Sequence, residues 1–191
     1  MSKAVMLSIR PKWCEKIISG EKTIEVRKTK PKLDTPFRGY IYCTLQGCNE
    51  FFRVDLGRDV AKWNRGKWAD RKGNVIGEFT CDRIYKIDKD STGFLFKAGG
   101  LSVYKQAAEE KCDLRVAMTD DELHGYLGHC QGYGWHISDL RIYDAPRKLS
   151  EFERPYKCNE CDAKWATECN ACHEEGKIKR PPQSWCYVQE G

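Results

Sequence analysis

The sequence has no long apolar run. None of its stretches approaches the ~20 consecutive apolar residues that a membrane-spanning helix needs. The apolar stretch from Ala4 to Ile9 is too short for the core of a secretion signal, and it has no small-residue cleavage site. We therefore expect a cytoplasmic protein that makes no use of a membrane.

Several enzyme signatures are also missing. The sequence contains no glycine-rich phosphate loop before Lys-Ser or Lys-Thr, no Gly-x-Ser-x-Gly elbow and no His-Glu-x-x-His motif. It also has no internal repeat and no low-complexity segment. With 191 residues, 40% of them hydrophobic and 32% charged, the chain has the composition of one ordinary globular domain.

Cysteine, in contrast, is abundant, and its spacing predicts a metal site. The chain has 11 cysteines, an odd number, and no export signal, which favours reduced thiols over a disulfide framework. Two Cys-x2-Cys pairs, Cys158 with Cys161 and Cys169 with Cys172, offer four thiolates for one tetrahedral ion. Because four thiolates leave no open coordination position, we predict one structural zinc ion in an insertion spanning 155–178. The alternatives are an iron–sulfur cluster and four incidental thiols.

Positive charge is concentrated in two segments. Residues 1–39 hold ten Lys or Arg against four Asp or Glu, a net charge of +6. Residues 53–72 hold seven basic and three acidic side chains, interleaved with Trp63 and Trp68. Basic clusters beside aromatic rings suit a polyanion with stackable bases, whereas the alternative is an ordinary solvated surface.

Hydrophobic periodicity predicts a mixed α+β fold. Pro11 suits a first helical position and Gly20 a left-handed helix end, whereas Thr119 and Glu122 have the spacing of a capping box. The polar segment 45–73 is expected to be a basic insertion loop. Strands are expected at 4–9, 23–27, 39–44, 74–87, 134–143 and 185–188, and helices at 11–19, 102–112 and 119–127.

Three charged side chains mark the second expected strand. Lys22, Glu25 and Arg27 follow a predicted helix end and stand at the start of the strand. A lysine and a glutamate held close together can exchange protons or orient the amide edge of a ligand. The alternative is an exposed strand face that carries an ion pair.

Three motifs together resemble the ASCH-domain family of the PUA-like superfamily. The opening Leu7–Lys12 and Gly20–Arg27 segments resemble the start of these proteins. Gly134–Leu140 and the closing Arg180–Val188 resemble members found in phages and prophages. The resemblance implies one domain over residues 1–191, a PUA-like mixed β-barrel of five to six strands with short helices, and a cleft near the first helix and second strand.

The resemblance also implies a role on RNA or on a nucleotide. Basic side chains would grip phosphates, the cleft would receive a base, and Tyr40 or Trp135 would stack on it. The expected ligand-binding residues are Arg10, Lys12, Lys22, Glu25, Arg27, Tyr40 and Trp135.

An enzymatic alternative stays open. Some ASCH relatives resemble amidohydrolases that deacetylate N4-acetylcytidine, and alignment of the motif places their catalytic lysine on Lys22. Their threonine falls on Glu25, which is a departure because a carboxylate is not a hydroxyl nucleophile. Lys22 and Glu25 could then serve a nucleoside amidohydrolase or a ribonuclease. A third hypothesis is that this is an interaction protein whose zinc segment presents loops to a protein partner.

Overall fold

The fold is taken from a computed structural model that describes residues 3–45, 71–111, 114–129, 131–155 and 176–189. Contacts divide the chain into two compact units. The first unit is Met1–Glu15, Arg38–Phe79 and Arg141–Gly191, and the second is Lys16–Phe37 and Thr80–Leu140. Each unit contains one five-stranded sheet, so the chain passes repeatedly from one unit to the other.

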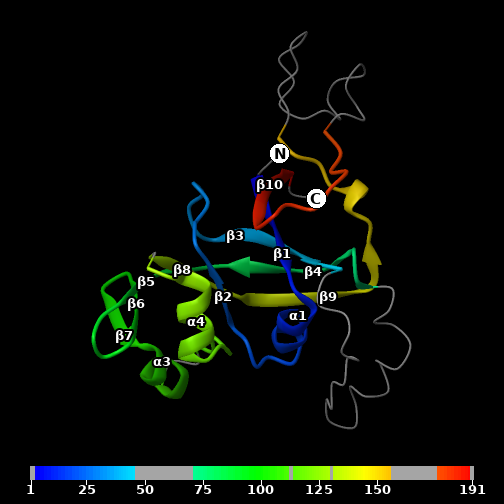
Figure 1. The fold of residues 1–191 in the computed structure, drawn as a ribbon. Helices are drawn as coiled ribbons and strands as arrows, with labels where there is room; N and C mark the ends of the chain where they lie inside the picture. The colour runs from blue at the N-terminus through cyan, green and yellow to red at the C-terminus, as the bar shows by residue number, and fades with distance from the viewer. Residues whose placement is uncertain (1–2, 46–70, 112–113, 130, 156–175, 190–191) are drawn as a thin grey trace. The chain divides into compact units, whose positions relative to one another are not determined.

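The sheet of the first unit has the strand order β10-β1-β3-β4-β9. β1 pairs with β3 in parallel and with β10 in antiparallel orientation, so a strand from the C-terminal end flanks the first strand (Figure 1). The strands are β1 (Lys3–Ile9), β3 (Phe37–Cys43), β4 (Val75–Cys81), β9 (Ser138–Arg147) and β10 (Trp185–Gln189).

The position of β1 in the core of the first unit explains why its sequence is an almost continuous apolar run. β1 has neighbours on both edges, and four consecutive residues from Ala4 to Leu7 are completely buried. Tyr40 packs edge-on against Phe152, with ring centroids 4.9 Å apart. The core cluster consists of Ala4, Met6, Tyr40, Tyr42, Val75, Phe152, Ile178 and Val188.

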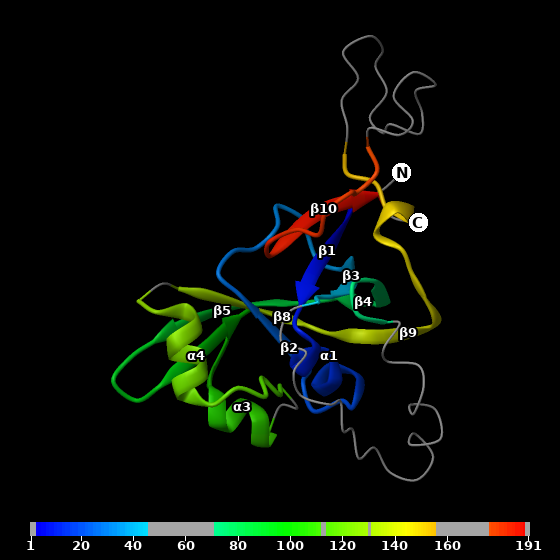
Figure 2. The same cartoon turned by 45° about the vertical axis from the view of Figure 1, so that its right-hand side comes forward.

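The sheet of the second unit has the order β2-β8-β5-β6-β7, and two helices cover one of its faces (Figure 2). Its strands are β2 (Ile24–Arg27), β5 (Ile84–Lys89), β6 (Phe94–Ala98), β7 (Leu101–Tyr104) and β8 (Gly132–His136). The helices are α3 (Lys105–Lys111) and α4 (Asp120–Leu127).

Strand register assigns side chains of the second sheet to two faces. Residues directly opposite in antiparallel strands point to the same side, and successive residues alternate. Val26, Tyr85 and Ile87 therefore share the face that packs on the helices, which we call the helix face. Glu25, Arg27, Trp135, Tyr133 and Lys86 belong to the opposite face, which we call the polar face.

The predicted helix signals are confirmed. α1 (Pro11–Ile18) begins at Pro11, and Gly20 follows it with a φ of +75°. Thr119 caps α4 by accepting a hydrogen bond from the backbone of Glu122, whose side chain accepts one from the backbone of Thr119. Local signals thus place both helices correctly.

The prediction of five to six strands is wrong, because the described residues form ten. The expected strand 74–87 is broken at Asp82 and Arg83 into β4 and β5, and the expected strand 134–143 is broken at Ile137 into β8 and β9. Apolar residues continue past each break, so periodicity does not reveal it. The start of the expected helix 102–112 forms β7, and the hairpin β6–β7 was not predicted.

Two predicted insertions lie mostly outside the described residues. This holds for 46–70 of the basic segment 45–73 and for 156–175 of the zinc segment 155–178. The single-domain organisation stays a prediction. No helix in the described part of the chain is long and apolar enough to cross a membrane.

Candidate functional site

Lys22, Glu25 and Arg27 come together in the second unit. The Glu25 carboxylate lies between the two cations, with Oε1 2.9 Å from Arg27 Nη2 and Oε2 3.6 Å from Lys22 Nζ. Lys22 Nζ also donates a hydrogen bond of 2.8 Å to the carbonyl of Val116. We call these three side chains the Glu25 cluster.

Backbone hydrogen bonds fix the position of the cluster. Lys22 N–H donates to the carbonyl of Lys16, which holds the turn after α1. The N–H groups of Thr23 and Ile24 both donate to the carbonyl of Arg115, at 2.8 and 3.0 Å. The strand start is thereby tied to the segment that supplies the Val116 carbonyl to Lys22.

All three charged side chains of the cluster are buried. The exposed fractions are 2% for Lys22, 6% for Glu25 and 5% for Arg27, so the alternative interpretation, an exposed strand face that carries an ion pair, is wrong. Burial lowers the pKa of Lys22, and the nearby carboxylate of Glu25 opposes this effect only in part. Buried charges without a structural need are rare, which makes this cluster the leading candidate site.

The two aromatic residues predicted to stack on a base are core residues. Trp135 lies opposite Glu25 in the β2–β8 register, has no exposed surface and packs edge-on against Phe37 at 5.7 Å. Tyr40 is fully buried in the first unit against Phe152. Neither ring presents a face to a ligand, so the stacking role predicted for Tyr40 and Trp135 is withdrawn.

Arg10 and Lys12 belong to the first unit and are exposed. The carbonyl of Arg10 accepts hydrogen bonds from Trp13 and Cys14 at the start of α1. Lys12 Nζ lies over the ring of Trp13, 4.7 Å from its centroid. Both side chains have the exposure that a phosphate contact requires.

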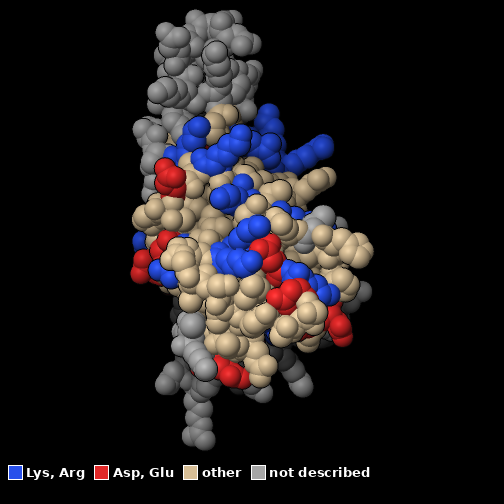
Figure 3. Space-filling view, turned by 90° about the vertical axis from the view of Figure 1, so that its left-hand side faces the viewer, with Lys and Arg blue, Asp and Glu red and all other residues tan. Residues whose placement is uncertain are grey.

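The loop that follows Arg27 carries basic side chains beside aromatic rings. Lys28 and Lys30 are exposed, and their ammonium groups lie 5.6 and 5.8 Å from the ring centroids of Tyr126 and Tyr133. Lysine and arginine also gather in one region of the face drawn in Figure 3, where few acidic side chains lie. Sequence reasoning missed both tyrosines, because each is distant from the loop along the chain.

The Glu25 cluster offers a defined set of chemical functions. Lys22 and Arg27 are hydrogen-bond donors, and Glu25 is an acceptor held between them. Such a set suits the donor and acceptor groups on the edge of a nucleobase. An amine with a lowered pKa also gives up its proton more readily than an ordinary lysine, which suits proton transfer.

The four predicted zinc ligands, Cys158, Cys161, Cys169 and Cys172, lie outside the described residues. The chain on either side of them is described, and it pairs. Glu153 and Lys177 form an antiparallel bridge, and Arg154 N–H donates to the carbonyl of Gly176 at 2.9 Å. The described residues on the two sides of the cysteine segment therefore lie side by side.

The fold is that of the ASCH-domain proteins, a mixed α+β fold. Solved structures of ASCH from Zymomonas mobilis resemble this chain. The unmutated protein has a TM-score of 0.52 at 16% identity, covering 98% of this chain and 88% of its own. A point mutant has a TM-score of 0.53 at 16% identity, covering 99% and 92%. No family model and no curated protein matches the sequence.

Proposed function

We propose that this protein binds RNA or a nucleotide, with the Glu25 cluster contacting the base and the adjacent lysines contacting phosphates. One arrangement supports the proposal: the buried cluster continues directly from Arg27 into a loop whose exposed lysines lie beside tyrosine rings. Hydrogen-bond donors and acceptors for the edge of a base thus lie next to cations for the phosphates of the nucleic acid. The ASCH-like motifs of the sequence point the same way.

Binding of fluorescent single-stranded RNA tests the proposal. We expect the double variant Lys28→Ala/Lys30→Ala to bind about tenfold more weakly at low salt, because two phosphate contacts are lost. The matched control is Lys148→Ala/Lys179→Ala, which removes the same charge from exposed positions of the first unit. Equal affinity of the two double variants would contradict the proposal.

Base recognition needs a separate measurement. An abasic oligonucleotide of the same length keeps every phosphate but offers no base edge to Lys22, Glu25 or Arg27. We expect it to bind more weakly than the ordinary RNA. If both bound alike, the Glu25 cluster would have no part in recognition.

Hydrolysis of a modified nucleoside is a second candidate function. It is favoured by one observation, the lowered pKa of a buried lysine beside a carboxylate. Mass spectrometry of a modified-ribonucleoside panel, with N4-acetylcytidine included, tests it. Turnover by the native protein that Lys22→Ala abolishes would support an amidohydrolase. Turnover that survives in Lys22→Ala would remove Lys22 from the mechanism.

We propose, separately, that Cys158, Cys161, Cys169 and Cys172 bind one structural zinc ion. The pairing of Glu153 with Lys177 supports it, because it brings together the two ends of the segment that holds the four cysteines. In so short a segment, metal binding would supply the free energy of folding. Metal analysis of protein purified without chelator should find one zinc per chain, and Cys158→Ser should lose it. Cys186→Ser, which changes a half-buried thiol of β10, is the control and should keep it. Metal-free native protein would overturn this proposal.

A further inference from the structure

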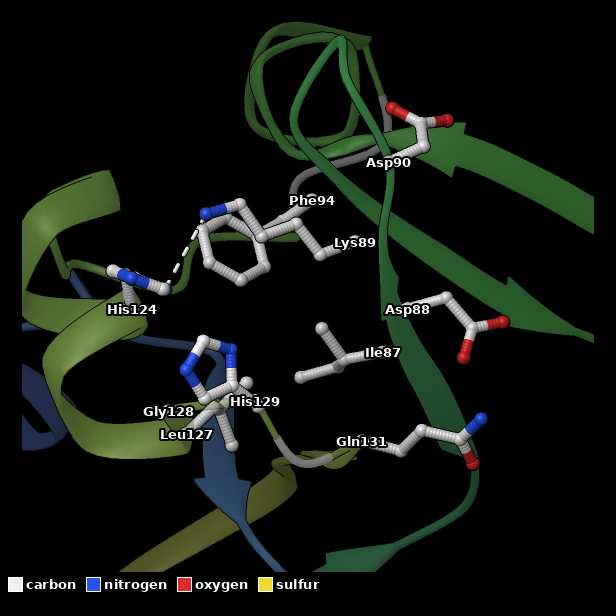
Figure 4. A pocket seen from close by; sticks show the side chains of 10 residues that line it. All are labelled: Ile87, Asp88, Lys89, Asp90, Phe94, His124, Leu127, Gly128, His129 and Gln131. Atoms are coloured by element: carbon white, nitrogen blue, oxygen red, sulfur yellow. Dashed lines mark hydrogen bonds between the residues drawn. The ribbon is translucent and has the colours of Figure 1, made fainter.

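A pocket in the second unit stands apart from the Glu25 cluster. It has a volume of about 660 Å³, and residues from β5, β6 and the end of α4 line it (Figure 4). Pockets that bind small molecules have volumes of roughly 300–1,000 Å³. We call it the Lys89 pocket.

Strand register separates this pocket from the proposed base-binding site. Ile87 and Lys89 project from the helix face of β5, and Phe94 lies directly opposite Lys89 on β6. Glu25 and Arg27 project from the polar face of the same sheet. A ligand in the pocket would therefore leave the Glu25 cluster untouched.

The wall of the pocket is apolar and its rim carries nitrogen donors. Ile87, Phe94 and Leu127 are almost completely buried and form the wall, whereas Lys89 and His124 are exposed at the rim. Lys89 Nζ lies 3.3 Å from Nδ1 of His124. An ammonium group only donates, so a hydrogen bond here requires Nδ1 to accept, and that tautomer leaves Nε2–H as a further donor.

A second imidazole joins these donors. The ring of His129 meets that of His124 edge to face, with centroids 6.3 Å apart, and both rings line the pocket. Figure 4 shows Lys89 and the two imidazoles gathered on one side of the pocket. The ammonium group of Lys89 and the imidazole rings of His124 and His129 thus line the same pocket.

Two carboxylates also line the pocket, but each has its own partners. Asp88 lies between Lys86 and Lys97, at 3.3 and 3.1 Å. Asp90 accepts from the Tyr104 hydroxyl at 2.9 Å and from the backbone of its own turn. Figure 4 shows both carboxylates pointing away from the imidazoles. The two carboxylates are therefore bound by groups other than Lys89 and the imidazoles.

We propose that the Lys89 pocket binds a phosphate monoester whose oxygens accept hydrogen bonds from Lys89, His124 and His129. The apolar wall suits the organic part of such a molecule. A metal ion is a poorer fit, because the described residues include no group of three His, Cys, Asp or Glu side chains placed to hold one. This site goes beyond the proposed function and does not depend on it.

Histidine NMR provides the test, because the whole chain has only four histidines. On titration with inorganic phosphate, the ring signals of His124 and His129 should shift saturably, and those of His136 and His173 should not. Sodium chloride at equal ionic strength is the control for salt. The Lys89→Gln variant should bind phosphate about tenfold more weakly, because one charge-assisted donor is lost. Lys148→Gln, at an exposed position of the first unit, should bind normally.

Two further titrations identify the source of the phosphate. A nucleoside 5′-monophosphate that binds more tightly than phosphate alone would indicate a free nucleotide. A short RNA that shifts the two signals only when it carries a 5′-phosphate would indicate an RNA end. The proposal is overturned if all four histidine signals move in parallel, if none moves, or if Lys89→Gln leaves the titration unchanged. Repeating it with Lys28→Ala/Lys30→Ala should leave the shifts intact, which separates this site from the proposed RNA contacts.

Discussion

Glu25 interacts with two cations at once, and its side chain has an exposed fraction of only 8%. Replacing it by glutamine would leave the buried ammonium and guanidinium groups without their counter-charge. Removing one partner of a buried ion pair costs about 3–5 kcal/mol. We expect Glu25→Gln to lower the free energy of unfolding by about that amount, measured by urea denaturation.

Glu21→Gln is the matched control for this prediction. Glu21 is exposed, and its carboxylate accepts a hydrogen bond only from the nearby Ser19 hydroxyl among the contacts described for it. Exposed changes of this kind stay within about 0.5 kcal/mol. A loss no larger for Glu25→Gln than for Glu21→Gln would show that the cluster is not a buried charge network.

The lowered pKa of Lys22 gives stability a pH dependence. Burial lowers this pKa from its ordinary value of 10.5. Between the lowered and the ordinary value the unfolded chain holds the proton and the folded chain does not, so the free energy of unfolding rises with pH. Lys22→Met lacks this contribution. The native protein should therefore gain stability relative to Lys22→Met as the pH rises from neutral towards 10.5.

Paired urea titrations at several pH values measure this difference. Lys28→Met, at an exposed position of the neighbouring loop, serves as the control, and its difference from the native protein should stay flat. A flat difference for Lys22→Met as well would contradict a buried lysine with a lowered pKa.

At the residue scale, the sequence predicted the grouping of Lys22, Glu25 and Arg27 but not its surroundings. Their spacing along one short segment made proximity predictable. The Val116 carbonyl gave no signal, because every residue has a carbonyl. The role of Tyr40 and Trp135 was predicted wrongly, because an aromatic residue in a strand pattern suits a buried core as well as a stacking surface.

At the element scale, the backbone of β8 is closely packed at Gly134, whereas the backbone of α4 is open to solvent at Gly125. A Cβ on Gly134 would lie 2.8 Å from Ile24 Cγ2 and 3.2 Å from a ring carbon of Phe96, so Gly134→Ala overpacks the helix face. We expect a loss of about 1–3 kcal/mol. A Cβ on Gly125 in α4 would meet nothing within 4 Å, so Gly125→Ala should add about 0.5–1 kcal/mol.

Thermal unfolding of the two variants tests both predictions, the loss of stability for Gly134→Ala and the gain for Gly125→Ala. A stabilising Gly134→Ala would mean that β8 does not pack closely on Ile24 and Phe96. A destabilising Gly125→Ala would mean that this position is not an ordinary exposed helix site.

The difference between local and distant interactions explains which elements could be predicted from the sequence. α1 and α4 carry local signals, a proline start and a capping box, which act within a few residues. The breaks at Asp82 and Ile137 depend on where distant strands pair. The side chain of Asp82 lies 2.6 Å from that of His136, and Ile137 N–H donates to the carbonyl of Thr23. Such contacts leave no mark in the local periodicity.

At the scale of the whole molecule, the fold class was predictable and the organisation into two units was not. Motifs near both ends and in the middle indicated one ASCH-like fold, and structural similarity to ASCH proteins supports that fold. Each unit is assembled from segments that are far apart in the sequence. A single sequence gives no direct information on which distant segments share a sheet, so the division appears only in the structure.

The central claim is that RNA is held by cations beside the Glu25 cluster, and the salt dependence of RNA affinity tests it most directly. The logarithm of the binding constant should fall linearly with the logarithm of salt concentration, with a slope of roughly −0.7 per phosphate contact. In Lys28→Ala/Lys30→Ala the slope should become shallower by about 1.4, as two contacts are lost. A slope near zero in the native protein, or an unchanged slope in the variant, would contradict the account.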